Sequence, residues 1–334
     1  AMDAWEEVPA DAAAAALARA DSVGDAFELL FRYGCRDFRD IGHKAIYVSN
    51  SWRALNAIGI DHAEPVIRSL AYALLYRDND SKDADAPADR PIKRNRELAE
   101  KIPDTWQNGK IDEQATREML AALREHSDED CCQLTVEMLN RGVAPQSIWD
   151  ALMVGAGELL MRQPGIVALH AVTSTNALNF AYRTAASDQT RRLLLLQNAA
   201  FVPLFRQAMT QRGKIGAERA DQLEPASIDA KNPSAIEEIF AAVGRNNAEA
   251  ARKVFGYLDS GGDPQTFSDA ARLLIFTKGN NAHDYKFSAA VLEDYGHVSH
   301  AWRNRYLATS VYNLRGSSQA DNKLVDRVRS ALRA

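Results

Sequence analysis

The fold is decided by PQSIWDALMVGAGELLMR (residues 145–162) and, three residues later, by IVALHAVTSTNALNFAYRT (166–184). In both segments apolar residues recur at helical spacing, and the strict alternation of apolar and polar residues that marks a half-buried strand is absent. Such long segments joined by a short connection are typical of neighbouring antiparallel helices. The centre of the chain therefore predicts an all-α protein.

The same helical period extends outward from this centre in almost every long segment. We predict a multi-helix single domain of packed antiparallel helices that covers residues 1–334. Suitable N-cap residues precede several of the segments, namely Asp112, Ser187 and Asn246. The expected helices lie at about 10–20, 23–35, 41–58, 63–77, 92–101, 112–126, 130–141, 145–162, 166–186, 188–211, 234–243, 246–259, 264–276, 282–295, 300–315 and 320–333.

Two segments interrupt the helical pattern. Residues 78–91 (DNDSKDADAPADRP) are charged and nearly devoid of large apolar side chains, and residues 213–233 mix charges, glycine and two prolines. Each is either a linker between an N-terminal and a C-terminal bundle or a long surface excursion of one domain. We favour one domain, with an internal division near 213–233 as the alternative, because the histidines discussed below lie on both sides of each segment.

Composition restricts the function. The 334 residues are 46% hydrophobic and 25% charged and carry a formal net charge of −5. This balance argues against nucleic-acid or anionic-membrane partners, because both need a basic surface. No apolar run reaches the roughly 18 residues of a membrane span. We expect a cytoplasmic protein, while the start at Ala1-Met2 leaves open that an export signal has been removed.

The cysteines predict no disulfide and no catalysis. Cys35, Cys131 and Cys132 are an odd number without CxxC spacing, and adjacent cysteines rarely satisfy disulfide geometry. The acidic residues around Cys131 and Cys132 raise rather than lower a thiol pKa. We therefore expect reduced thiols.

Four histidines give the best functional clue. His43, His62, His170 and His283 each lie in or beside a strongly apolar helical segment, and imidazole is the commonest metal ligand of proteins. Because they are far apart in sequence, only folding can bring them together. The alternative is that each is a hydrogen-bonded core histidine, which is the more frequent case for any one histidine taken alone.

The neighbours of these histidines are polar where the helix pattern is apolar. His43 and Tyr47 are spaced i, i+4 and share a helix face, and the apolar turn before His170 places that imidazole in the core with Thr173 and Asn176 nearby. Buried polar groups are costly unless a network, a ligand or a metal satisfies them. These two segments therefore indicate a buried polar site.

Lys286 follows His283 by one helical turn, on a helix that we expect Asn281 to cap. An inward lysine loses solvation, which lowers its pKa and makes the neutral amine accessible. A neutral amine can take up carbon dioxide, and the resulting carbamate would supply the oxygen ligand that a histidine site lacks. The alternative is an ordinary lysine whose ammonium group reaches water.

Two further groups of residues are weaker candidates. Asp294, His297 and His300 have i, i+3 spacing, but Gly296 lies among them, so we interpret this segment mainly as a helix end. Glu158, within an apolar helix, is either an inward carboxylate or, as we favour, a residue on the polar edge. The common nucleotide-binding, hydrolase and zinc-protease motifs are absent from the sequence.

Three stretches resemble the questin oxidase-like family, whose members oxidise aromatic polyketides. They are an early histidine with a following apolar helix (His43 to Trp52, then Leu70 to Leu74), a central LHAVTSTNAL (169–178) followed by RLLLLQ (192–197), and a late AHDYK (282–286). Together they span most of residues 40–295. The family often has further histidines where this chain has Tyr47 and Asn176.

The resemblance implies an all-helical oxygenase with a mononuclear non-haem iron. Carried over by position, the metal ligands are His43, His170, His283 and a carboxylated Lys286, with His62 as the candidate to replace a missing histidine. Tyr47 and Asn176 are the candidate catalytic residues. Fe(II) would activate dioxygen beside an aromatic or quinone-like small molecule, in a pocket for which Tyr47, Trp52 and Tyr285 are lining candidates.

Three alternatives stay open at the level of the sequence. The same ligands suit zinc or manganese and a hydrolytic reaction. A non-covalent haem needs only one axial histidine and an apolar slot. A non-catalytic helical scaffold or binding protein with structural histidines is the alternative from a different class.

Overall fold

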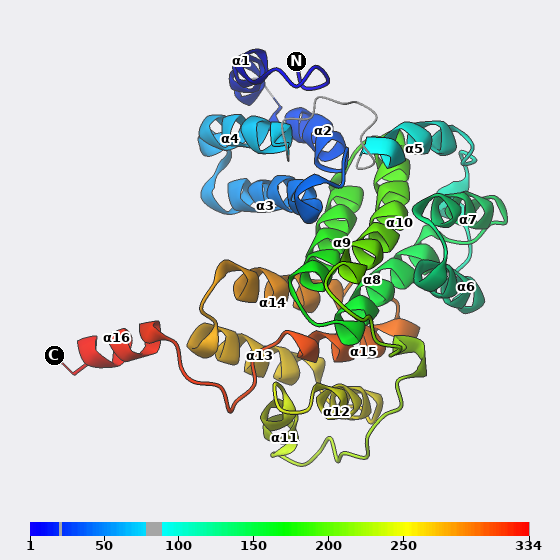
Figure 1. The fold of residues 1–334 in the computed structure, drawn as a ribbon. Coiled ribbons are helices and arrows are strands. Elements are labelled where there is room, and N and C mark those ends of the chain that lie inside the picture. The colour runs from blue at the N-terminus through cyan, green and yellow to red at the C-terminus, as the bar shows by residue number, and fades with distance from the viewer. Residues whose placement is uncertain (20–21, 78–88, 334) are drawn as a thin grey trace. The chain divides into compact units, whose positions relative to one another are not determined.

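The computed structural model describes residues 1–19, 22–77 and 89–333. These residues form sixteen α-helices and several short 3-10 turns, and within them there is no strand, so the predicted all-α class is confirmed (Figure 1). Each expected helix is present with ends that agree within three residues, except that the helix expected at 300–315 ends at Thr309 and continues as a 3-10 turn. The helices are α1 (Glu7–Ala18), α2 (Val23–Gly34), α3 (His43–Ile58), α4 (Ala63–Leu75), α5 (Arg90–Glu100), α6 (Glu113–Glu125), α7 (Asp128–Asn140), α8 (Pro145–Arg162), α9 (Ile166–Thr184), α10 (Asp188–Thr210), α11 (Ala235–Ala242), α12 (Asn247–Asp259), α13 (Pro264–Lys278), α14 (Ala282–Asp294), α15 (His300–Thr309) and α16 (Lys323–Ala331).

The helix starts follow the local chemistry of the sequence. The carboxylate of Asp112 accepts from the backbone N–H groups of Gln114 and Ala115, and Asn246 caps α12 in the same way. The Ser187 hydroxyl accepts from the backbone N–H of Thr190 in the first turn of α10. These side chains satisfy donors that the first turn of a helix leaves without a partner. The three predicted caps are therefore present.

The contacts group the chain into two compact units. The first comprises Ala1–Leu152 and Ser174–Ala208, and the second comprises Met153–Thr173 and Met209–Ala334. In the first unit α4 packs against α1 and α3, α2 packs against α3, and α7 packs against α5 and α6. In the second unit α12 packs against α11 and α15, and α13 packs against α14. The prediction of a single domain stays a prediction.

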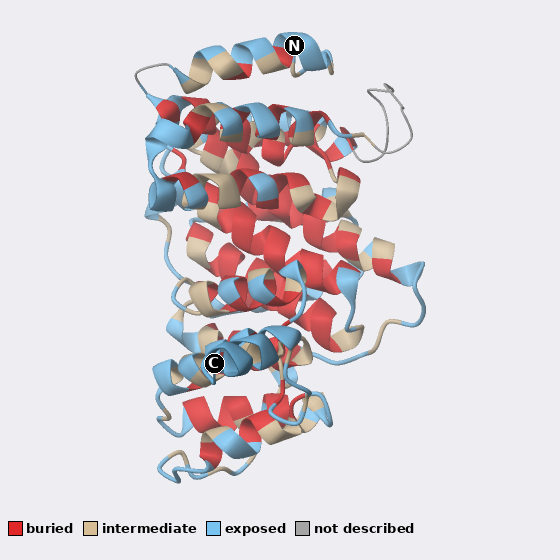
Figure 2. Ribbon diagram, turned by 90° about the vertical axis from the view of Figure 1, so that its left-hand side faces the viewer, coloured by how far each residue is buried: buried red, intermediate tan, exposed pale blue. Residues whose placement is uncertain are grey.

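The central helices are buried almost all round, as their apolar sequences require. Residues 147–161 of α8 and 167–179 of α9 are buried without a break (Figure 2). Among the described residues no helix has the length and apolarity that crossing a membrane requires. The three cysteines are free and buried, and burial raises the pKa of each thiol to about 12.

The structure tests the predictions for one of the two interrupting segments and for Glu158. Residues 213–233 are largely irregular, with one 3-10 turn at Ala220–Gln222, and most of 78–91 lies outside the described residues. Glu158 is 2% exposed, so our preference for the polar edge was wrong. Its carboxylate accepts from the backbone N–H of Ala220 at 2.9 Å, which gives this buried side chain a hydrogen-bond partner in the interior.

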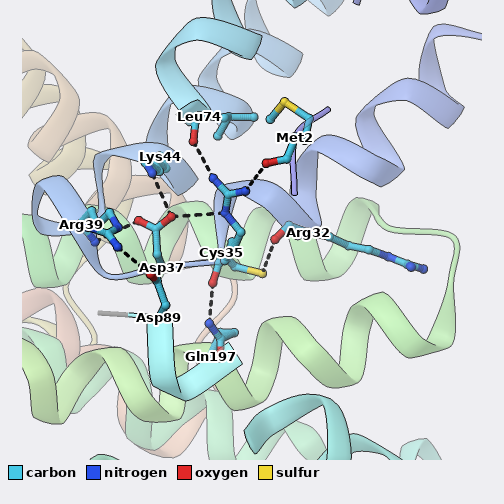
Figure 3. A network of polar contacts seen from close by, with 10 residues as sticks. Met2, Arg32, Cys35, Asp37, Arg39, Lys44, Leu74, Asp89 and Gln197 are labelled. Carbon is cyan, nitrogen blue, oxygen red and sulfur yellow. Dashed lines mark hydrogen bonds and ion pairs between the residues drawn. The ribbon is translucent and has the colours of Figure 1, made fainter. Parts of the chain in front are cut away.

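A buried charge network in the first unit fixes the chain just before α3 (Figure 3). The Asp37 carboxylate, fully buried, accepts from Lys44 Nζ at 2.8 Å and from the backbone N–H of Arg39 at 3.1 Å. Arg36 lies 3.4 Å from the same carboxylate and stacks on the Trp5 ring, 3.7 Å from its centroid. Charges this deep persist only when they are paired and hydrogen-bonded, so this network holds the turn at 37–44 in one geometry.

Candidate metal centre

His43 is the first residue of α3, and an unusual turn sets its position. The preceding residues Asp40, Ile41 and Gly42 all have left-handed backbone angles, with φ of 51°, 43° and 78°. A β-branched residue such as Ile41 rarely adopts this conformation, and it persists only where the surroundings enforce it. The turn directs the Asp40 carbonyl at the ring, and His43 Nδ1 lies 2.6 Å from that oxygen.

Two features of the turn require glycine at position 42. A residue with a side chain is disfavoured at this positive φ, and a Cβ atom there would lie 2.8 Å from Ser174 Oγ and 3.1 Å from Phe205 Cζ. We expect Gly42→Ala to destabilise the protein by about 1–3 kcal/mol, from left-handed strain and overpacking. The measurement is chemical denaturation.

The matched control for that variant is Gly24→Ala, in α2. Gly24 is exposed and helical, and a Cβ atom there meets nothing closer than Ser22 Oγ at 3.6 Å. Alanine at a helical position of this kind should be neutral or stabilising, by up to about 1 kcal/mol. Equal effects of the two substitutions would contradict a special role for Gly42.

His170 lies in the buried middle of α9 and is only 2% exposed. Its Nδ1 is 2.6 Å from the carbonyl oxygen of Ile166, one turn earlier. The polar residues that follow are also engaged, because Thr173 donates to the Leu169 carbonyl and Asn176 Oδ1 accepts from Arg53 at 3.4 Å. Not every polar group of this helix is satisfied in this way, because Ser174 Oγ is buried and has no hydrogen-bond partner among the described residues.

His283 is the second residue of α14, and Asn281 caps that helix as predicted. The Asn281 side chain accepts from the backbone N–H groups of His283 and Asp284 at 2.9 Å and 3.3 Å. The half-buried ring of His283 meets that of His170 edge to face, with centroids 5.2 Å apart. The second unit therefore brings together two of the four predicted histidines.

His43, His170 and His283 are the three predicted histidines whose rings are partly or fully buried, and we call them the histidine group. His43 belongs to the first unit, and the other two belong to the second unit, where their rings meet. In His43 and His170 the carbonyl next to Nδ1 can only accept, so Nδ1 carries a proton and Nε2 is the ring nitrogen left for a metal ion. Orientation of this kind by an outer partner is usual for metal-binding histidines. The donor set therefore fits a divalent cation.

The other predicted ligands lie differently. His62 ends a 3-10 turn after Gly59, its side chain is exposed, and it does not join the histidine group. Lys286 lies one turn after His283 on α14 and is half-buried. Asp294 is buried and accepts from the Tyr306 hydroxyl at 2.9 Å, and within the described residues it forms no metal-binding group with His297 and His300.

Tyr47 connects His43 to a groove in the first unit. Its ring stacks on that of His43, with centroids 5.6 Å apart and an interplanar angle of 21°. Its hydroxyl donates to Asp40 Oδ2 at 3.5 Å, and burial, reinforced by Asp40, raises its pKa. Tyr47 also lines a largely apolar groove of about 570 Å³ between α3 and α4, with Asn50, Ser51, Ala54, Pro65, Val66, Ser69, Leu70 and Ala73.

The remaining aromatic candidates serve local packing. Trp52 packs on Phe27 with ring centroids 4.6 Å apart, and it does not line the groove of Tyr47. Tyr285 is 38% exposed, donates to the Gly279 carbonyl at 3.2 Å and lies beside a different groove, between α13 and α14.

Sequence reasoning missed Asp40 as a positioning residue. Its carbonyl holds Nδ1 of His43, and its Oδ1 lies 3.3 Å from the same nitrogen. The available signal was the sequence Asp-Ile-Gly directly before the histidine, since glycine there favours a left-handed turn.

No family model, curated protein or solved structure matches this chain.

Proposed function

We propose that the protein binds a divalent metal ion through Nε2 of His43 and His170 and a ring nitrogen of His283. The observation that carries the proposal is the hydrogen bond from Nδ1 of His43 and of His170 to a backbone carbonyl, which leaves Nε2 as the ligand atom, together with the contact between the rings of His170 and His283. Three neutral nitrogen donors suit iron, zinc or manganese and leave coordination positions for other ligands.

We further propose a metal-dependent oxidoreductase, and within that class a non-haem iron oxygenase for an aromatic or quinone-like substrate. Support comes from the resemblance described above and from the groove that Tyr47 lines. Bound iron would supply the activation of dioxygen. The apolar walls of the groove would hold a planar molecule, and Asp40 would orient the Tyr47 hydroxyl at its edge.

The test separates metal binding from redox chemistry. Metal-free protein is titrated without oxygen with Fe(II), Zn(II) and Mn(II) in turn, and bound metal is counted per chain. The iron form is then mixed with oxygenated buffer and a hydroxynaphthalene probe. One metal per chain and probe-dependent oxygen consumption only with iron are expected. No metal bound would overturn the site, whereas metal binding without oxygen consumption would leave the site and reject the oxygenase.

Lys286 provides a separate test of the carbamate ligand. If carbon dioxide converts the amine to a carbamate, Lys286→Arg should lower iron affinity by roughly 10-fold or more, because a guanidinium stays protonated and cannot react. Lys286→Glu should restore part of that affinity by supplying an oxygen donor. The measurement is iron affinity in buffers with and without bicarbonate. Equal affinity in the wild type and in Lys286→Arg would remove lysine from the ligand set.

A further inference from the structure

Asn50 presents a hydrogen-bond donor of fixed orientation to the groove between α3 and α4. Its Oδ1 accepts from Nη1 of Arg53, one turn further along α3, at 3.3 Å. A guanidinium group can only donate, so the oxygen of the Asn50 amide faces Arg53 and the NH2 group is left for another partner. Asn50 lines the groove, and its Nδ2 donates to no described residue. The N–H bonds of this amide are therefore available to a ligand.

Arg53 is itself held by two residues of α9, within the same unit. Its Nη2 donates to Asn176 Oδ1 at 3.4 Å, and its guanidinium carbon lies 3.8 Å from the centroid of the Phe180 ring. Stacking on a ring and hydrogen bonds in its plane together restrict the orientation of a guanidinium group. The Asn50 amide therefore cannot exchange its oxygen and nitrogen without losing the bond to Arg53.

The other polar groups of the groove offer no second fixed donor. The Tyr47 hydroxyl donates to Asp40, so its oxygen is left as an acceptor, and the Ser51 hydroxyl can rotate to donate or to accept. The Ser69 hydroxyl donates to a backbone carbonyl of its own helix at 2.8 Å. The remaining lining residues are apolar, namely Ala54, Pro65, Val66, Leu70 and Ala73. Among the described residues, the lining of the groove thus has one fixed donor and no charged side chain.

We propose that Asn50 determines the specificity of the groove, by selecting an uncharged aromatic ligand whose carbonyl oxygen accepts from the Asn50 amide. This inference rests on the proposed role of the groove as the substrate site. A carbonyl oxygen only accepts, so it matches a donor that cannot reverse. A carboxylate is disfavoured, because it would lose hydration in an apolar groove that offers no charged side chain in return. A hydrocarbon of the same shape would leave the amide without a partner.

The first test compares two probes of nearly equal shape, 1-acetylnaphthalene and 1-ethylnaphthalene, by equilibrium dialysis against the full chain in the presence of a chelator. Asn50→Leu removes the donor and should weaken binding of the ketone by about 3- to 10-fold, the usual worth of one neutral hydrogen bond. Binding of the hydrocarbon should not weaken. The matched control is Asn56→Leu, the same change at an exposed position of α3 outside the groove, and it should leave both affinities unchanged.

Asn50→Asp makes the test specific for the direction of the hydrogen bond. One carboxylate oxygen can keep the bond to Arg53, and the other then replaces the donor in the groove with an acceptor. This variant should bind the ketone more weakly than the wild type and bind 1-naphthol, whose hydroxyl donates, more tightly. A purely structural role of Asn50 would not reverse the order of the two ligands. Far-UV circular dichroism checks that each variant keeps its helices.

A blocked groove separates this proposal from the proposed substrate site. Ala54→Trp fills the groove and should abolish binding of both naphthalenes. If Ala54→Trp abolished binding while both Asn50 variants bound the ketone like the wild type, the role of Asn50 would be overturned and the groove would stand. If the wild type bound neither probe, or if Ala54→Trp bound both normally, the groove itself would be rejected and this proposal with it. Because the chelator removes metal ions, none of these outcomes depends on the histidine group.

Discussion

His43→Ala is expected to lose bound metal almost completely. In the proposed site the substitution removes one of three nitrogen donors, and two imidazoles hold a divalent ion much more weakly against water and buffer than three. Loss of an outer partner alone typically lowers metal affinity by 10–100-fold, so loss of a ligand should lower it by at least about 100-fold. Metal content after dialysis, and the affinity for Fe(II) and Zn(II), measure the effect. His283→Ala should behave in the same way.

Two features make this experiment decisive. His43 and His283 are partly exposed, so their replacement by alanine leaves no large cavity and the fold should persist. The control is His126→Ala, since His126 has an exposed side chain at the end of α6 and does not belong to the histidine group. Because His170 is buried, His170→Gln is the better variant at that position. Full metal content in all the histidine-group variants would show that these imidazoles are structural.

The arrangement of helices could be predicted because it depends on patterns along the chain. Helical spacing of apolar residues and local caps such as Asp112 and Asn281 act within a few residues, and the structure follows them closely. Even α16 was expected, although it buries nothing, because its amphipathic period is clear. Burial of Glu158 could not be predicted, since its partner is a backbone N–H 62 residues away.

The predictions for the histidines were limited in the same way, because they rested on patterns along the chain. An apolar helical context singled out His170 and His283, whose rings do meet. The same reasoning selected His62, but a short 3-10 turn after Gly59 leaves that side chain in solvent. The difference arises from a backbone turn of three residues, which the apolar pattern does not encode. Whether the grouped histidines are metal ligands stays a prediction.

The charged sequence Arg36-Asp-Phe-Arg-Asp40 gave no sign that its charges are buried. Charged runs usually face water, and here burial depends on partners supplied from elsewhere in the first unit. Leu74 offers its carbonyl to Arg36, Asp89 pairs with Arg39 at 2.6 Å, and Trp5 covers the cluster. Such a network follows from tertiary packing, and only the structure reveals it (Figure 3).

Asp37→Ala should therefore be among the most destabilising single substitutions in the chain. It would leave the buried Lys44 ammonium without its carboxylate and the Arg39 backbone N–H without its acceptor. Removing one partner of a buried ion pair costs about 3–5 kcal/mol, because the remaining charge stays desolvated and unpaired. Equilibrium denaturation in urea measures the loss.

The matched control is Asp104→Ala. Asp104 forms an ion pair of nearly equal length, 3.0 Å to Arg192, but its carboxylate is fully exposed. Solvent screens such a pair, so its loss should cost less than about 1 kcal/mol. Asp37→Asn adds a second comparison, because it keeps the shape and one acceptor oxygen while it removes the charge. If Asp37→Ala were as mild as Asp104→Ala, water would have to reach Lys44 in the folded protein, and the turn that places His43 would not depend on this network.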